Sequence, residues 1–328
     1  MTAFSRDVLA IDAARTAAQI QEAIRHQVLT VLHRRGVVIG LSGGIDSSVV
    51  TCLCARALGG ERVLVLLMPE RDSSADALRL GRLLTSQFGL PTIVEDVEPL
   101  LAAAGCYTRQ AEAIREVFPD YGDGYRCKIT LPSILDRDRL NVSELTIEAP
   151  SGELSTCRLP AAAYLQLVAA TNFKQRVRKL LEYYHSDRLN YAVAGTPNRL
   201  EYDQGFFVKQ GDGAADLKPI AHLFKTQVYA LAGYLGVPDE IRERRPTTDT
   251  FSLPQTQEEF FFALPYEQMD LCLYGRNHRV PAADVAGAAG LTEVQVERVY
   301  RDIDQKRRAT RYLHVRPLLV EPVAEVDG

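Results

Sequence analysis

The sequence predicts an α/β protein built on a doubly wound parallel sheet, and two features of the chain carry this prediction. Short, nearly unbroken apolar runs alternate with longer segments of helical periodicity in both halves of the chain. Strands that are apolar on both faces are typical of a parallel sheet, because helices cover both faces of such a sheet. A Gly/Ser-rich turn follows the first apolar run, at the strand end where these sheets bind ligands.

The first half of the chain shows the alternation in order. An amphipathic first helix is predicted by apolar residues at helical spacing, namely Ile20, Ile24, Val28, Val31 and Leu32. The predicted elements that follow are a strand over 37–41, a helix over 47–58, a strand over 63–68, a helix over 76–88 and a strand over 92–94. Gly36, Gly59 and Gly89 end the three helices, because glycine accepts the left-handed backbone of a helix C-terminus.

Residues 119–160 interrupt the alternation. Polar and apolar residues alternate over 125–131 and 143–149, which predicts two strands, and a Pro-Ser-Gly turn allows 153–159 to return as a third. The elements predicted after them are a helix around 173–184, a strand over 189–194 and helices over 222–235, 282–289 and 292–306. We therefore expect a single domain over 1–328, with an insertion at 119–160 and a helical tail at 279–328.

Composition narrows the class of protein. The net charge of −4 gives no general reason to expect a nucleic-acid partner. No apolar run reaches the roughly 18 residues of a membrane helix, and the N-terminus lacks a signal-peptide pattern, so no membrane partner is expected. The six cysteines are scattered without metal-ligand spacing. We expect a cytoplasmic protein with reduced thiols.

The turn after the first strand reads Ser-Gly-Gly-Ile-Asp-Ser-Ser over 42–48. Adjacent glycines allow close approach to a ligand, and serine hydroxyls, backbone N–H groups and a helix N-terminus together make an anion site, most simply for phosphate. Asp46 suits such a site if Mg²⁺ bridges it to the phosphates. The alternative is a glycine-rich turn with only a structural role.

The 42–48 loop resembles the pyrophosphate loop of the N-type ATP pyrophosphatases and lacks the glycine-lysine pattern of kinase P-loops. Four later blocks, in this order, resemble the NAD synthetase family: Gly-Thr-Pro-Asn-Arg-Leu-Glu at 195–201, the glycine-rich stretch at 205–216, Leu-Phe-Lys-Thr-Gln-Val at 223–228 and Pro-Thr-Thr-Asp at 246–249. The resemblance covers roughly 20–118 and 160–310, and it implies a Rossmann-like fold of the ATP pyrophosphatase type.

The resemblance implies specific roles on the ATP side of the site. Asp46 and Glu201 match the two Mg²⁺ carboxylates of the family, and Lys225 matches a residue that contacts the ATP phosphates. The residues implied to bind ATP or pyrophosphate are Gly40, Ser42, Gly43, Gly44, Asp46, Ser47, Ser48, Thr196, Lys225 and Thr247. The alternatives are a surface carboxylate for Glu201 and a solvated helix lysine for Lys225.

The acceptor side is implied by other residues. Asp212 resembles the family aspartate near the ammonia site, where it would help to deprotonate ammonium and act with Asp46 and Lys225 in catalysis; a purely structural Asx-turn is the alternative. Asn172, Arg176, Lys209, Asp212 and Asp216 match positions that bind the acid substrate. Asn172 and Arg176 share one helix face, which could also be an ordinary solvated basic face. Core packing is the simpler interpretation of Phe206 and Phe207, and the Lys306-Arg307 pair resembles a basic pair found late in the family.

The activity implied is ammonia-dependent NAD synthesis. ATP adenylates the carboxylate of deamido-NAD with release of pyrophosphate, and ammonia displaces AMP to give NAD, with Mg²⁺ as cofactor. Nothing N-terminal is long enough for a glutaminase domain, so ammonia is expected free or from a separate protein, and the family implies a homodimer. Because residues 119–160 and the stretch after 247 depart from the family pattern, an amide ligase for another carboxylic acid is the alternative. A non-enzymatic nucleotide-binding module is disfavoured by the intact Asp46, Glu201 and Lys225.

Overall fold

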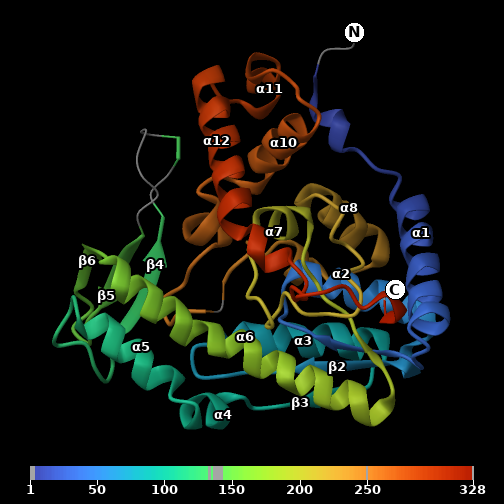
Figure 1. Cartoon of the computed structure of the whole chain (residues 1–328), viewed down its shortest axis with the longest axis horizontal. Helices are drawn as coiled ribbons and strands as arrows, with labels where there is room; N and C mark the ends of the chain where they lie inside the picture. The colour runs from blue at the N-terminus through green and yellow to red at the C-terminus, as the bar shows by residue number, and fades with distance from the viewer. Residues whose placement is uncertain (1–3, 132–133, 136–142, 249, 327–328) are drawn as a thin grey trace.

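The structure, a computed structural model, describes residues 4–131, 134–135, 143–248 and 250–326 (Figure 1). Its centre is a parallel sheet with the strand order β3-β2-β1-β7. These strands are β1 (Val37–Gly40), β2 (Val63–Leu67), β3 (Thr92–Val94) and β7 (Ala192–Val193). The predicted α/β class with a doubly wound parallel sheet is confirmed.

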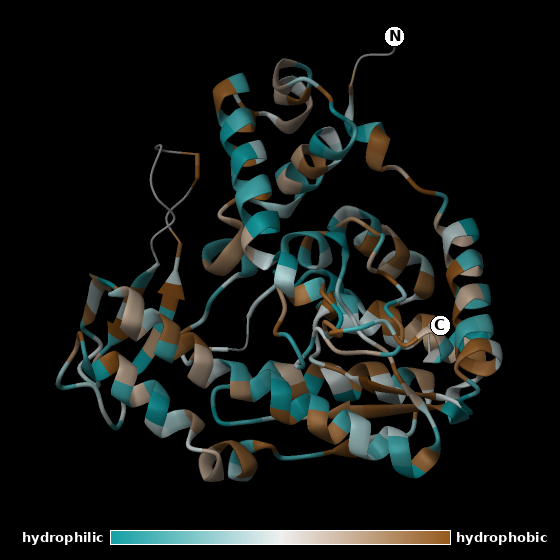
Figure 2. Cartoon of the chain, in the orientation of Figure 1, coloured by the Kyte–Doolittle hydropathy of each residue, from teal (hydrophilic) through white to brown (hydrophobic). Residues whose placement is uncertain are grey.

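Helices cover both faces of this sheet. One face packs against α1 (Ala13–Arg25), α2 (Ile45–Leu58), α3 (Ala75–Phe88) and α8 (Lys225–Leu235). The opposite face packs against α4 (Glu98–Ala103), α5 (Cys106–Arg115) and α6 (Ala161–Leu189). Successive side chains of a strand point to opposite faces, so Val37 and Ile39 enter the first core and Val38 the second. The strands accordingly read as continuous apolar runs (Figure 2).

Several helices and strands begin or end at residues other than the predicted ones. Helix α2 begins at Ile45, two residues before the prediction, so Asp46 lies in its first turn. Helix α8 begins at Lys225, three residues later than predicted, because the Asp270 carboxylate accepts the backbone N–H groups of Lys225 and Thr226. Strand β7 is shorter than the predicted strand over 189–194, since α6 continues to Leu189.

The insertion forms the antiparallel sheet that the alternation predicts. Its strands are β4 (Arg126–Thr130), β5 (Glu144–Glu148) and β6 (Leu154–Arg158), in the order β4-β5-β6. Alternate residues such as Ile129 and Leu145 pack with α5 and α6 in a small core. Residues 132–133 and 136–142 of the predicted insertion lie outside the described residues.

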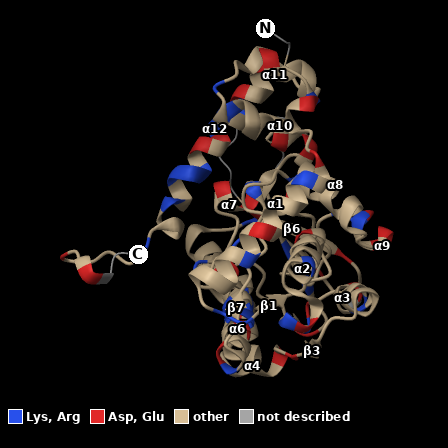
Figure 3. Ribbon diagram, turned by 90° about the vertical axis from the view of Figure 1, so that its right-hand side faces the viewer, with Lys and Arg blue, Asp and Glu red and all other residues tan. Residues whose placement is uncertain are grey.

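A helical group lies beyond the carboxyl ends of the parallel strands (Figure 1). It contains α10 (Tyr266–Asn277), α11 (Ala282–Ala289) and α12 (Glu293–Thr310), so it begins before the predicted tail at 279. Basic side chains gather in the C-terminal half of α12 (Figure 3). The shorter helical segments are Arg6–Leu9, His26–Val31, Gly60–Arg62, α7 (Arg199–Gln204), α9 (Asp239–Arg242), Glu258–Phe262, Arg311–His314 and Ala324–Val326.

Candidate active site

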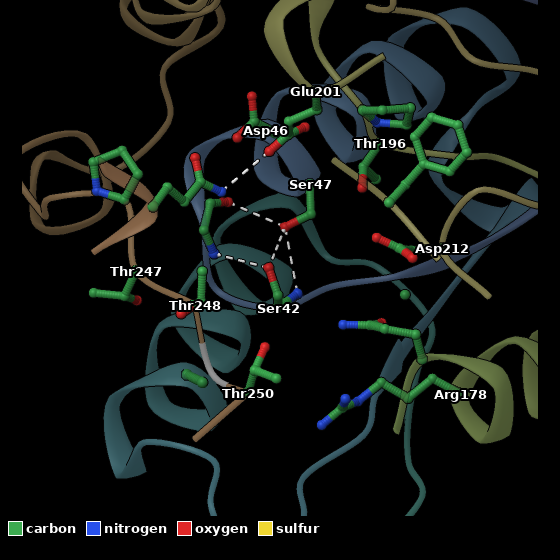
Figure 4. A pocket seen from close by; sticks show the side chains of 18 of the residues that line it. Ser42, Asp46, Ser47, Arg178, Thr196, Glu201, Asp212, Thr247, Thr248 and Thr250 are labelled. Carbon is green, nitrogen blue, oxygen red and sulfur yellow. Dashed lines mark hydrogen bonds between the residues drawn. The ribbon is translucent and has the colours of Figure 1, made fainter. Parts of the chain in front are cut away.

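A cavity of about 450 Å³ opens at the carboxyl end of β1 (Figure 4). Its walls come from the β1–α2 loop, the middle of α6, residues 194–212, the start of α8 and residues 244–248 and 250–261. Figure 4 shows Thr247, Thr248 and Thr250 on one side of the cavity and Thr196 and Asp212 on the other. A volume of this order suits a small-molecule substrate.

The β1–α2 loop is held by its own serines. The Ser42 N–H donates to Ser47 Oγ at 3.3 Å, and the two hydroxyl oxygens are 3.1 Å apart. Gly43 has φ +73°, and a Cβ there would lie 2.7 Å from the carbonyl oxygen of Ala77. Glycine is therefore required at this position. The loop leads directly into the N-terminus of α2, which favours an anion in the cavity.

Gly40 and Ser48 were also predicted to belong to the anion site, and the structure places them differently. A Cβ at Gly40 would lie 2.8 Å from Glu182 Oε1, so the glycine lets α6 approach the end of β1. Ser48 does not line the cavity: its side chain is buried and its Oγ donates to the Gly44 carbonyl at 2.8 Å. Starting α2 at Ile45 turns Ser48 back into the helix, so the placement of its hydroxyl in the anion site is corrected.

Asp46 lies between two partners that are distant in sequence. One carboxylate oxygen forms an ion pair with Lys225, and the other accepts a hydrogen bond from Asn198 Nδ2 at 3.0 Å. Asn198 also caps the N-terminus of α7, where its Oδ1 accepts the N–H groups of Leu200 and Glu201. Asn198 therefore connects the first turns of two helices that face the cavity.

Glu201 lies in the first turn of α7, and a capping box fixes its position. Its Oε2 accepts the Asn198 backbone N–H at 3.0 Å, and its Oε1 accepts from Gln257 Nε2 at 3.1 Å. Burial and, next, the charge of Asp46 raise the pKa of Glu201 to about 8. A carboxylate that resists ionisation beside another carboxylate fits a site for a cation, and oxygen ligands suit Mg²⁺.

The described residues contain no group of three or more His, Cys, Asp or Glu side chains placed to hold a metal ion. A divalent cation at Asp46 and Glu201 would therefore take its other ligands from phosphate oxygens and water. The residues present fit such a cation, because both carboxylates line the cavity and a bound cation would favour the ionised form of Glu201.

Lys225 is the first residue of α8, and its side chain is only 2% exposed. Burial lowers its pKa, but the charges of Asp46 and Glu201 outweigh burial, so the net shift is upward. The amine therefore stays charged. Asp270, which holds the first backbone N–H groups of α8, is fully buried, and burial raises the pKa of this carboxyl to about 7.

Asp212 lines the opposite end of the cavity. Its Oδ1 accepts the Val208 N–H at 2.7 Å, which closes the glycine-rich loop, while burial raises its pKa. Both a structural turn and a proton acceptor are compatible with this geometry. Phe206 and Phe207 also line the cavity; Phe206 stacks on Phe261 with ring centroids 4.7 Å apart, as expected for core packing.

Three predicted acceptor residues do not line the cavity. Arg176 donates through Nε to the Lys209 carbonyl at 3.3 Å, and Lys209 Nζ donates to the Tyr312 carbonyl at 3.0 Å. Asp216 accepts the Val193 N–H at 2.7 Å and so supports β7. Of the predicted acceptor residues, Asn172 and Asp212 lie at the cavity. Lys306 does not line the cavity; its amine forms an ion pair with Asp302 and donates to the Phe261 carbonyl.

Several residues that line the cavity were not predicted from the motifs. Lys179 and Glu182 form an ion pair of 2.5 Å, and both are buried in the cavity wall formed by α6. Thr248, which lies inside the Pro-Thr-Thr-Asp block, and Gln257, which follows it, also line the cavity, although neither was predicted as a site residue. The lysine and glutamate stand three residues apart on one helix face, which was the only local signal available.

The fold and the β1–α2 loop define the class: an α/β protein of the ATP pyrophosphatase type. The NAD synthase family model matches residues 16–118 and 138–312, and the chain belongs to this family. The family predicted from the motif blocks is confirmed. The gap in the match falls within the predicted insertion.

The chain is 62% identical over 318 residues to the NH(3)-dependent NAD(+) synthetase of Mesorhizobium japonicum, covering 97% of this chain and 100% of that one. It resembles the structure of the NMN synthetase of Francisella tularensis with a TM-score of 0.62 at 20% identity, over 96% and 100% of the two chains. It also resembles the NH3-dependent NAD synthetase of Campylobacter jejuni, with a TM-score of 0.61 at 22% identity, over 95% and 100%. These two structures show the shared fold. None of the helices described here is long and apolar enough to cross a membrane.

Proposed function

We propose that this chain is an ammonia-dependent NAD synthetase, which converts deamido-NAD, ATP and ammonia into NAD, AMP and pyrophosphate. The observation that carries the proposal is the arrangement of Asp46, Lys225 and Glu201 around the end of the Ser/Gly loop. The relative from Mesorhizobium japonicum, which is named for this activity and aligned over nearly the whole chain, supports the choice of substrate.

In the first step, a carboxylate oxygen of deamido-NAD attacks the α-phosphorus of ATP. A new O–P bond forms, and the bond to pyrophosphate breaks. The loop N–H groups, the α2 N-terminus and the Lys225 ammonium are positioned to bind the departing pyrophosphate and to offset its charge. No side-chain nucleophile is needed, so the residues act by binding and electrostatics.

In the second step, ammonia attacks the activated carbonyl carbon, and AMP leaves with the electrons of the C–O bond. Ammonia is mostly protonated at neutral pH, so a group must accept a proton before or during the attack. Asp212 is a candidate, since it lines the cavity and its pKa is raised above that of an ordinary aspartate. Free ammonia and ammonia released by a separate protein would reach it alike.

Mg²⁺ is the proposed cofactor, held by Asp46 and Glu201. When bound, it would neutralise phosphate charge and stabilise the leaving pyrophosphate. Asn198 and Gln257 orient the two carboxylates through their amide hydrogens, at 3.0 and 3.1 Å. Such supporting hydrogen bonds fix the orientation of a carboxylate that would bind a metal ion.

A homodimer is proposed, with α6 at its interface. Large apolar side chains on this helix are exposed, with Leu165 at 66%, Leu180 at 64% and Tyr184 at 59%. They recur along one side of a 29-residue helix, which gives a second copy of the chain a long apolar contact. Light scattering of the purified chain tests this proposal: a monomer at micromolar concentration contradicts it.

The activity is tested by supplying ATP, Mg²⁺ and ammonium with deamido-NAD, with the corresponding mononucleotide acid, or with no acid. We expect NAD and AMP in equal amounts from deamido-NAD, and neither product without an acid. Equal or faster turnover of the mononucleotide acid would favour the alternative of a different acceptor. Asp46→Asn should abolish AMP formation with either acid, and full activity in that variant contradicts the proposed site.

A further inference from the structure

The segment of residues 250–260 runs between the cavity and the insertion sheet. Its backbone is hydrogen-bonded to β4 and to Leu131, the residue that follows β4. The Leu253 N–H donates to the Cys127 carbonyl at 3.0 Å, and the Leu131 N–H donates to the Glu259 carbonyl at 2.8 Å. The Cys127 N–H donates to Ser252 Oγ at 2.9 Å. The free edge of β4 is thus covered by this segment, as natural sheets usually require.

Gln255 joins this edge to the cavity. Its side chain is buried, with Nε2 donating to the Ile129 carbonyl of β4 and Oε1 accepting from Thr248 Oγ1 at 3.2 Å. Its own carbonyl accepts the Thr248 N–H at 3.0 Å, and Thr256 pairs with Thr247 in an antiparallel bridge. Thr247 and Thr248 both line the cavity. One glutamine therefore contacts the insertion and the cavity wall at once.

The same segment reaches the carboxylates. Gln257, two residues beyond Gln255, donates to Glu201 Oε1 at 3.1 Å. At the other end, Phe251 is buried in the core of the insertion with Ile129 and Leu145, and it packs edge-on against Phe260. The insertion core, the threonine pair and Glu201 are consequently linked by a continuous set of contacts.

We propose that the insertion sheet is a brace for the active site and that Gln255 is its positioning residue. The sheet holds the 250–260 segment against the cavity, which orients Thr247 and Thr248 for ATP and Gln257 for Glu201. The insertion and the divergent stretch after 247, which both depart from the family pattern, are then one physical unit. The kinetic part of this proposal rests on the proposed function, whereas the structural part does not.

Gln255→Glu tests the brace with almost no change in volume, because a carboxylate can accept from Thr248 but cannot donate to the Ile129 carbonyl. We expect KM for ATP to rise about tenfold, with a smaller change in kcat, since a misplaced binding wall weakens ground-state and transition-state binding alike. Amide hydrogen exchange on the full chain should be faster at Thr248 and Leu253 and unchanged within α2.

Thr156→Val is the matched control, since this threonine of β6 is exposed and its hydroxyl oxygen lies 3.0 Å from that of Thr146 on the same sheet. It should change neither KM nor exchange. Ser252→Ala, which removes only the bond to Cys127, is a milder second variant in case Gln255→Glu folds poorly; it should raise exchange at Leu253.

An unchanged exchange rate in both brace variants would overturn the proposal, as would an activity loss with KM for ATP unaltered. If the unmodified chain makes no NAD, the proposed function fails, while the exchange measurement still decides whether the insertion holds the segment.

Discussion

The ammonium group of Lys225 forms an ion pair with the carboxylate of Asp46, although 179 positions separate the two residues in the chain. Their side chains are only 2% and 14% exposed. Asp46 lies in the first turn of α2 and Lys225 begins α8, so the pair joins the N-termini of two helices on one face of the sheet. Its position beside the Ser/Gly loop places a fixed positive charge at the edge of the anion site.

Lys225→Met removes this charge and keeps the length of the side chain. We expect kcat/KM for NAD formation to fall by about 10²- to 10³-fold, the usual effect of losing one preorganised electrostatic partner. The measurement is steady-state NAD formation with ATP varied at saturating ammonium. Arg62→Gln is the control, because this arginine is half-exposed and its nearest carboxylate is 3.9 Å away. A Lys225→Met enzyme as active as the unmodified one contradicts the proposed role.

The raised pKa of Glu201 predicts that the stability of the metal-free chain depends on pH. Its pKa is about 8 in the folded chain and near 4.5 when unfolded, so the folded state holds the extra proton between these values. The free energy of unfolding that this group contributes therefore falls as pH rises from about 4.5 to 8, by about 1.4 kcal/mol per unit of pKa at most.

Glu201→Gln removes this titration. In a chelator, we expect the Tm difference between Glu201→Gln and the parent chain to grow in favour of the variant from pH 5 to pH 8 and to level off above pH 8. Mg²⁺ should restore the parent chain selectively at high pH, because a metal binds the ionised carboxylate. A Tm difference that is constant with pH would show that Glu201 does not titrate in this range.

Gly43 and Gly152 form a matched pair for testing the loop. Both have positive φ, but a Cβ at Gly43 meets the Ala77 carbonyl at 2.7 Å, whereas nothing lies within 4 Å at Gly152. We expect Gly43→Ala to lower the free energy of unfolding by about 1–3 kcal/mol and to raise KM for ATP severalfold. Gly152→Ala should cost about 1 kcal/mol from backbone strain alone and leave KM unchanged. Urea unfolding with ATP kinetics separates the two; equal effects on KM would contradict the proposed loop.

Lys174, a buried residue of α6, is expected to stabilise the fold. Its fully buried amine donates to Glu70 at 3.0 Å, to Asp72 at 2.6 Å and to the Thr250 carbonyl at 2.9 Å. Lys174→Met leaves a buried carboxylate without its cation, so the free energy of unfolding should drop by about 3–5 kcal/mol. Adding Glu70→Gln to Lys174→Met should recover part of this loss in urea unfolding. Additive losses in the double variant would show that the two residues do not interact.

The elements that local patterns specify were predicted well. The apolar runs of β1 and β2, the alternation of β4 and β5 and the helix over Ala282–Ala289 depend on residues that are neighbours in sequence. Period and end signals are carried by such neighbours, so they can be read before the chain is folded.

The predictions that differ from the structure have a common cause. The start of α8 depends on Asp270, which comes from α10, and the first turn of α7, which carries Glu201, depends on the Asn198 cap. Arg176 donates to the Lys209 carbonyl and Lys209 to the Tyr312 carbonyl, and neither side chain lines the cavity. Both residues nevertheless lie in motifs that resemble substrate-binding motifs of the family. A motif specifies residue types along the chain, while the direction of a side chain depends on partners elsewhere.

Local patterns of residues were sufficient to predict the α/β class, the family and the three strands of the insertion before the chain is folded. Only the tertiary structure decided that Asp46 meets Lys225 and Asn198, that Gln257 supports Glu201, and that Gln255 joins the insertion to the cavity wall. These contacts join elements that are adjacent in space but far apart in the chain. They form only when packing of the apolar cores brings the elements together.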